Sequence, residues 1–286
     1  MISAERYGVS AWSATASITT RAKDATEVRF FVKYATGEHG KAQLEGEYNS
    51  VKEINKIVPG FAPRPHAFGK MEDTSSPTFF FLCEFIYITS DLPDPQALGA
   101  RLARMHRDSQ SPNGKFGFPV PTYDGKLPQI TSWDSSWTTF FSNLLSGIAR
   151  LDVEVNGPWD ELQIALDQTL HKVIPRLLDA LEADGRRIKP CLIHGDLWEG
   201  NIGTDYRTGN IYIFDAASYY AHNEMEIGIW RTEHHRMKSK AYKVEYLRNF
   251  GASEPVDEWD DRNRLYSIKT QLMYSAHVPG AKVRNA

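Results

Sequence analysis

The sequence predicts an α+β fold of two lobes, a small lobe built on an antiparallel sheet and a larger, mainly helical lobe. Before residue 90, β-type apolar runs at residues 27–34 and 78–88 flank one helical stretch. After residue 95, apolar residues recur at three- and four-residue steps, which indicates helices. A chain of 286 residues also lies near the size at which a single core divides into two. We therefore assign residues 1–90 to the small lobe and residues 91–286 to the large lobe.

The composition is that of an ordinary globular protein, with 41% hydrophobic and 24% charged residues. No apolar run is long enough to span a bilayer, and the first residues show no signal-peptide pattern. A net charge of −3 gives no general attraction to nucleic acid. Cys83 and Cys191 lie in strand-like runs and are expected to be buried free thiols of a reducing compartment. We expect a cytoplasmic protein, a monomer or weak dimer, without nucleic-acid or membrane partners.

Two neighbouring segments carry the strongest functional signal. Residues 192–201 read Leu-Ile-His-Gly-Asp-Leu-Trp-Glu-Gly-Asn, and residues 211–215 read Ile-Tyr-Ile-Phe-Asp. Each segment contains an apolar β-type run, and residues 205–210 between them are rich in turn formers. The two runs are therefore expected to pair as a hairpin. This pairing would place Asp196, Asn201 and Asp215 close together at one end of the two strands.

The spacing of these three residues is typical of phosphoryl transfer. Four residues separate Asp196 from Asn201, as between the base and the metal-binding asparagine of protein kinases, and Asp215 follows at the end of a later strand. We predict that Asp196 accepts the proton of a hydroxyl group, and that Asn201 and Asp215 bind Mg²⁺. Asp, Gly and Asn are also ordinary turn residues, which is the alternative interpretation. The motif favours a two-lobed protein-kinase-like fold that uses ATP and Mg²⁺, with the nucleotide held by the small lobe and the acceptor by the large lobe.

The small lobe supplies a candidate lysine for the phosphates. Lys33 follows the Phe-Phe-Val run of the strand at residues 27–34, and a helix is expected at residues 39–57. Glu47 shares the apolar face of that helix, where an unpaired carboxylate would be costly. We expect Glu47 to pair with Lys33 and aim it at the phosphates, rather than the two forming an incidental surface salt bridge.

Two further segments are candidates for nucleotide binding. Residues 8–15 occupy the place of a phosphate loop and offer Ser10 and Ser13 but only one glycine, although Ser/Thr-rich hairpin loops are also common. The strand at residues 78–88 would be the last of the small lobe, and its backbone around Glu84, Phe85 and Ile86 would hold adenine. A plain core strand explains the phenylalanines of this segment equally well.

The large lobe is expected to contain five helical segments, at residues 95–106, 133–148, 159–182, 224–248 and 258–276. Pro175 should bend the third of them. The long irregular stretch at residues 111–129 is expected to pack on the large lobe and to help shape the acceptor site.

At this point the chain resembles a known family, the fructosamine (ketosamine) kinases, within the aminoglycoside-phosphotransferase-like branch of the kinase fold. The likeness is carried by residues 31–33, 45–47, 115–118, 127–129, 194–201 and 214–224, together with Trp133. Residues 36–40 and 111–117 are similar to fungal members.

The resemblance implies a ketosamine-3-kinase that acts on the C3 hydroxyl of fructosyl- or ribulosyl-lysine in glycated proteins. The 3-phosphate so formed is unstable and releases the amine, which reverses glycation. Asp196 would face that hydroxyl. Trp198 would stack on the sugar, or else would only pack to fix the loop. His222, Glu224 and Glu226 would line the acceptor side.

The chain also departs from the family pattern. The phosphate loop lacks the several glycines and the cysteine of many members, so redox-switched dimerisation through this loop is not expected. Family members usually have a helix before this loop, whereas here only a few residues precede it. Two alternatives stay open: a phosphotransferase for an aminoglycoside, choline or homoserine, and, because of these departures, a pseudokinase that only binds.

Overall fold

The small lobe is a five-stranded antiparallel sheet with one long helix. The computed structural model describes residues 2–8, 10, 12–89, 91–233 and 235–281, so the expected lobe boundary at residue 90 and residues 9 and 11 of the phosphate loop lie outside the described residues. The strand order is β1-β2-β3-β5-β4. The strands are β1 Ser3–Arg6, β2 Ala14–Arg21, β3 Glu27–Thr36, β4 Pro65–Lys70 and β5 Thr78–Glu84. The strand expected at residues 27–34 is present as β3, and the one expected at residues 78–88 is present as β5, which ends at Glu84. The short strands β1 and β4 were not predicted.

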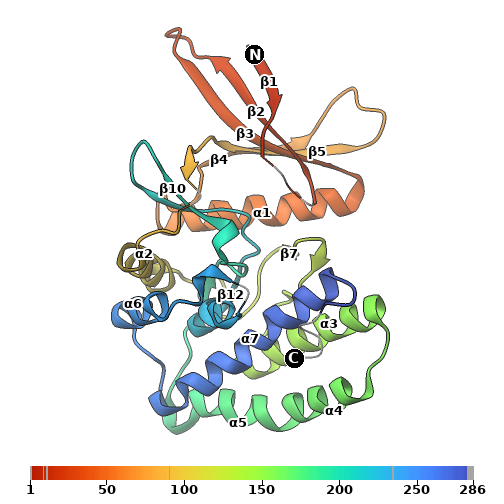
Figure 1. Cartoon of the computed structure of the whole chain (residues 1–286), viewed down its shortest axis with the longest axis vertical. Coiled ribbons are helices and arrows are strands. Elements are labelled where there is room, and N and C mark those ends of the chain that lie inside the picture. Colours follow the sequence, from red (N-terminus) through yellow and green to blue (C-terminus); the bar gives the residue numbers. More distant parts are fainter. Residues whose placement is uncertain (1, 9, 11, 90, 234, 282–286) are drawn as a thin grey trace.

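Helix α1, Gly37–Ile57, lies under the sheet on the side that faces the rest of the molecule (Figure 1). Its buried face includes Leu44, Val51 and Ile54, which confirms the expected helical periodicity. Small residues let this helix approach the large lobe closely. A Cβ at Gly46 would lie 2.5 Å from the carbonyl oxygen of Pro121, and Ser218 N donates to Ser50 Oγ. Packing of α1 therefore ties the small lobe to the large one.

The large lobe is mainly helical, as expected. Its α-helices are α2 Pro95–Asp108, α3 Trp137–Asn156, α4 Asp160–Gln168, α5 Ile174–Leu178, α6 Lys240–Phe250 and α7 Trp259–His277. The helix expected at residues 159–182 is present as consecutive helical turns from Asp160 to Leu181, with a π-helical turn, Thr169–Val173, between α4 and α5. Pro175 is the second residue after this turn, and a proline ring clashes with the carbonyl of the preceding turn. The helix expected at residues 224–248 is wrong in its first half, because Asn223–Arg231 forms 3₁₀ turns.

The expected hairpin between residues 191–193 and 211–213 is wrong. β9, Cys191–Ile193, pairs with β12, Tyr219–Ala221. β11, Ile211–Ile213, pairs with β10, Ile202–Asp205, a strand that was not predicted. The turn at residues 206–210 joins β10 directly to β11, so the nearest neighbours along the chain form the hairpin. β6, Ile88–Thr89, joins the other side of β10 and connects the end of the small lobe to this sheet.

A small hairpin within the irregular stretch at residues 111–129 lies between the two lobes. It consists of β7, Tyr123–Asp124, and β8, Leu127–Pro128. Gln43 Nε2 of α1 donates to the carbonyl oxygen of Gly125 at its tip. The stretch therefore also contacts the small lobe, which sequence analysis did not anticipate. One hydrophobic core cluster includes residues of both lobes. Among the described residues, no helix is long and apolar enough to cross a membrane.

Candidate active site

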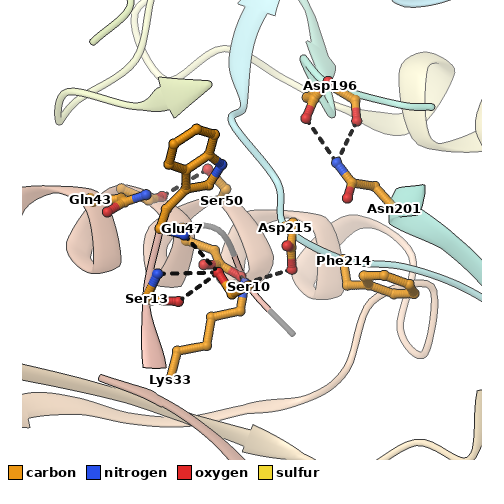
Figure 2. Close-up of polar contacts among 12 residues, drawn as sticks. Ser10, Ser13, Lys33, Gln43, Glu47, Ser50, Asp196, Asn201, Phe214 and Asp215 are labelled. Atoms are coloured by element: carbon orange, nitrogen blue, oxygen red, sulfur yellow. Dashed lines mark hydrogen bonds and ion pairs between the residues drawn. The ribbon is translucent and has the colours of Figure 1, made fainter. Parts of the chain in front are cut away.

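Lys33 on β3 lies between two carboxylates from different lobes. Its Nζ donates to Glu47 Oε1 at 2.7 Å and to Asp215 Oδ1 at 2.5 Å (Figure 2). The expected ion pair between Lys33 and Glu47 is therefore present. Burial alone would lower the pKa of Lys33, but the charges of Asp215 and Glu47 outweigh it and raise that pKa. Burial raises the pKa of Glu47 to about 7, against the effect of the Lys33 ammonium. Lys33 thus stays charged at neutral pH although it is buried.

Asp215 follows β11 in a conformation that few residues adopt. Its φ is +58°, in the left-handed region, which is uncommon outside glycine and is often found at functional sites. The preceding residue, Phe214, is fixed on both sides. Its N–H donates to the carbonyl of Asn201 at 3.0 Å, and its carbonyl lies 2.9 Å from Nε2 of His194. These backbone contacts, rather than the expected hairpin, bring Asp215 beside the loop at residues 194–201.

Asp196 and Asn201 form a pair on the large-lobe side of the cleft. Asn201 Nδ2 donates to Asp196 Oδ2 at 2.9 Å and to the Asp196 carbonyl at 2.8 Å (Figure 2). Burial and the nearby Asp124 carboxylate raise the pKa of Asp196 well above its usual range, and Lys269 acts in the opposite direction. Gly195, with φ +85°, makes the turn possible, because a Cβ there would lie 2.4 Å from the carbonyl oxygen of Ala217.

Glu226 holds the backbone of this loop and does not face the cleft. It is buried, and its carboxylate accepts from His194 N at 2.5 Å and Gly195 N at 3.1 Å. Trp230 Nε1 donates to the Leu197 carbonyl at 2.7 Å. The expected acceptor-lining role of Glu226 is therefore corrected, because both of its oxygens bind backbone amides.

His222 and Glu224 are likewise interior residues, and the expectation that they line the acceptor side is corrected. His222 is bonded through its two ring nitrogens to Tyr266 Oη and Ser253 Oγ, each at 2.8 Å. Glu224 is fully buried and accepts two hydrogen bonds from Arg262, at 2.7 and 3.0 Å. A buried charge requires such a partner, so the ion pair with Arg262 explains why a glutamate can occupy this otherwise apolar, buried segment.

Three adjoining cavities run from the sheet to the end of α7. The first, of about 270 Å³, lies under the sheet, and the second, of about 420 Å³, shares Lys33, Glu47 and Asp215 with it. The third, of about 350 Å³, shares Asp196 and Trp198 with the second. The predicted residues Ser10, Lys33, Glu47, Glu84, Phe85, Ile86 and Asp215 line the first cavity, and Ser13, Asp196, Trp198 and Asn201 line the second. Cys83 also lines the first cavity.

Trp198 lies at the boundary of the second and third cavities. It is 36% exposed, and its ring centre is 5.6 Å from that of His235. A Cβ at Gly200 would lie 2.3 Å from the indole, so only glycine admits this ring position. The indole of Trp198 is thus held by its contacts with His235 and Gly200, and it remains partly open to the cleft.

Sequence analysis missed Trp12, Asp124 and Lys269. Trp12 extends from the loop before β2 to the large lobe, where its ring centre is 5.3 Å from that of His277. Lys269 Nζ donates to Asp124 Oδ2 at 2.9 Å, and both side chains are largely buried. Lys269 lies four residues after Leu265 and three before Leu272, on the buried face of α7. Lys269 could have been recognised in the same way as Glu47, because an unpaired charge on a buried helix face is costly. Asp124 lies in an irregular stretch that has no periodicity.

The oxygen donors near the cleft suit a magnesium ion. Asn201 Nδ2 is directed to Asp196, so its amide oxygen points to the opposite side. Asp215 uses one oxygen for Lys33, and its side chain is 46% exposed. Within the described part of the chain, no group of three or more His, Cys, Asp or Glu residues could hold a metal alone. This set fits Mg²⁺, which commonly binds one or two protein ligands together with substrate phosphates and water.

Together, the sheet lobe, the helical lobe and the charged cleft define a protein-kinase-like fold. A crystal structure of a fructosamine-3-kinase candidate from Thermobifida fusca superimposes with a TM-score of 0.74 at 18% identity, covering 99% of this chain and 90% of that chain. A thermostable mutant of an aminoglycoside phosphotransferase superimposes with a TM-score of 0.55 at 14% identity, covering 99% and 88%. These similarities confirm the predicted fold.

The chain belongs to the fructosamine kinase family, whose family model matches residues 10–285. A protein-ribulosamine 3-kinase of Oryza sativa subsp. japonica is 34% identical over 203 residues, which are 70% of this chain and 55% of the relative. The ketosamine-3-kinase of Mus musculus is 29% identical over 228 residues, which are 72% and 70% of the two chains. The match thus spans about half the length of the rice relative.

Proposed function

We propose that this protein transfers the γ-phosphoryl group of ATP to the C3 hydroxyl of a ketosamine, such as fructosyl- or ribulosyl-lysine in glycated proteins. One observation carries the proposal. In a chain of the fructosamine kinase family, Lys33 with its two carboxylates and Asp196 with Asn201 border the same cavity.

The small lobe would hold the nucleotide. The first cavity has apolar walls that include Phe31, Phe81 and Phe85, which suit a flat purine ring. Lys33 would contact the phosphates, with Glu47 keeping its ammonium in place. Glu84, Phe85 and Ile86 would face adenine, and Ser10 and Ser13 would lie beside the phosphates. Catalysis by these groups is chiefly a matter of positioning and charge.

The large lobe would act on the acceptor. Asp196 would accept the proton of the attacking hydroxyl, with its carboxylate oriented by Asn201. Asn201 and Asp215 would hold Mg²⁺, which when bound neutralises charge on the phosphates. Trp198 would stack against the sugar, since its ring lines both cavities that adjoin Asp196.

A phosphate-transfer assay tests the proposal directly. Purified protein is incubated with Mg²⁺ and ATP labelled at the γ-phosphate, against fructosyllysine, ribulosyllysine, an aminoglycoside, choline and homoserine. We expect label in the two ketosamines only, and no transfer without Mg²⁺. Transfer to one of the other three compounds alone would instead assign a different small-molecule phosphotransferase. A folded protein that transfers to none would favour a binding role.

The cellular setting is part of the same proposal. We expect a cytoplasmic protein, a monomer or weak dimer, that acts on glycated lysine or glycated protein and not on nucleic acid or membranes. Cys83 and Cys191 are buried free thiols, which is typical of proteins from a reducing compartment. Sedimentation at several protein concentrations would measure the oligomeric state.

A further inference from the structure

Lys269 of α7 is a buried cation directly beside the turn that carries Asp196. Its side chain is 5% exposed, and its Nζ donates to Asp124 Oδ2 at 2.9 Å and to the Gly195 carbonyl at 3.2 Å. Gly195 directly precedes Asp196. One ammonium group therefore joins three separate segments: the β7–β8 hairpin, the turn after β9 and the helix α7.

Burying this ammonium costs free energy that an apolar side chain would not require. Asp124, whose side chain is 15% exposed, offsets that cost in part. Lys269 lies near Leu265 and Leu272 on the buried face of α7, where a methionine would satisfy packing. A charged pair at this position thus needs an explanation other than core stability.

Asp124, the partner of Lys269, also borders the third cavity, which lies on the proposed acceptor side of the cleft. Asp124 and Asp196 both line the third cavity, so two carboxylates face one small space. Like charges at short range repel each other, and an ammonium beside them reduces that repulsion. Asn201 orients the Asp196 carboxylate, and Lys269 fixes the backbone that precedes it.

We propose that Lys269, oriented by Asp124, is a positioning residue for Asp196. It holds the Gly195 carbonyl, and so the turn that carries the base, and its charge balances the two carboxylates that face the acceptor. This inference rests on the proposed function only for the role of Asp196 as base, because the contacts themselves are independent of the substrate.

The test uses Lys269→Met, with Lys238→Met as matched control. Lys238 forms an ion pair with Glu233, also at 2.9 Å, but that pair is exposed on the surface. We expect Lys269→Met to lower kcat for the active ketosamine about 100-fold, with the KM for ATP within about threefold, because a small displacement of the base is costly. Lys269→Arg should recover part of the loss, since it keeps the charge. Lys238→Met should behave as the unmodified chain.

Amide hydrogen exchange provides a readout that needs no substrate. We expect the peptide at residues 192–199 to exchange about tenfold faster in Lys269→Met, while peptides of β2 and β3 are unchanged. Unchanged exchange in this peptide, or a kcat within about threefold of the unmodified chain, would overturn the proposal. If the unmodified chain phosphorylates no ketosamine, the proposed function fails, and the exchange result still decides the role of Lys269.

Asp124→Asn covers the case in which Lys269→Met does not fold. It keeps the shape of the side chain and the ammonium but removes one carboxylate charge. We expect faster exchange at residues 192–199 with an unfolding midpoint close to that of the unmodified chain, because Asn holds a lysine less firmly than Asp does. Exchange equal to that of the unmodified chain would show that Asp124 does not orient Lys269.

Discussion

Lys33 and Asp215 are 182 positions apart in the sequence, yet the Lys33 ammonium lies 2.5 Å from the Asp215 carboxylate. The contact joins the sheet lobe to the helical lobe at the border of the first and second cavities. Phosphates held by Lys33 and a metal held by Asp215 would therefore meet at one point. Four predictions follow from this arrangement and from the residues that support it.

Replacing Asp215 by alanine should remove the metal dependence of nucleotide binding. The variant keeps the Lys33–Glu47 pair, so the proposed contact of Lys33 with the nucleotide should remain. We expect ATP binding in the presence of Mg²⁺ to weaken at least about tenfold, and the difference with and without Mg²⁺ to disappear. Calorimetric titration measures both. Asp257→Ala, at an exposed position before α7, is the control, and an unchanged Mg²⁺ effect in Asp215→Ala would disprove the metal assignment.

Replacing Asp196 by asparagine should stop turnover but leave nucleotide binding intact. The amide oxygen of Asn can still accept the hydrogen bond from Asn201, so the loop should keep its conformation. Loss of a general base lowers kcat by about 10²–10⁴-fold. Steady-state kinetics with the active acceptor measure kcat, and titration with ATP checks that the affinity is retained. Turnover near that of the unmodified chain would exclude Asp196 as the base.

Replacing Glu226 by glutamine should destabilise the protein rather than weaken acceptor binding. The Glu226 carboxylate accepts hydrogen bonds from two backbone N–H groups of the loop at residues 194–201. Hydrogen bonds to a buried charged group contribute about 1.5–3 kcal/mol. We expect a loss of this order in the free energy of unfolding, measured with urea. An increased KM for the acceptor with unchanged stability would instead support the role that the family resemblance implied.

Acidification should destabilise the protein through His222. Burial lowers the pKa of His222 to about 4, whereas the unfolded chain has the ordinary value of 6.5. Between these values the unfolded state binds the additional proton, so stability falls as pH decreases from about 6.5 to about 4. At pH 5 the expected loss is about 2 kcal/mol from this group.

Urea unfolding at pH 7 and pH 5 measures this loss. His222→Gln should reduce the difference between the two pH values, although it also removes the bond to Tyr266. His171→Gln, at an exposed position in the π-helical turn, is the control and should leave the difference unchanged. A pH dependence that is the same in His222→Gln as in the unmodified chain would contradict the assignment.

The parts of the fold that could be predicted are those in which local pattern and burial agree. The stripe on α1 placed Glu47 on an inward face, and the cost of an unpaired charge there pointed to Lys33. Asp196 and Asn201 could also be predicted from local pattern, because both lie in one short loop and their spacing is visible in the sequence.

What could not be predicted depends on contacts between distant segments. β10 has only four residues, Ile202–Asp205, with no clear alternation of apolar and polar residues. Its pairing with β11 therefore could not be predicted from the sequence. Glu224 and Glu226 follow Asp215 closely in the sequence, which made them candidates for the cleft. Both are buried, because Glu224 packs against Arg262 of α7 and Glu226 lies under the loop whose backbone it holds. Asp124 could be recognised only after Lys269 was found beside it.

The position of Cys83 has a consequence for chemical sensitivity. This thiol lines the proposed nucleotide cavity, and burial raises its pKa far above neutrality. Oxidants and electrophiles attack the thiolate, which is scarce under these conditions. Since the chain has only one other cysteine, also buried, the proposed ATP site should withstand peroxide and alkylating reagents without a protecting thiol.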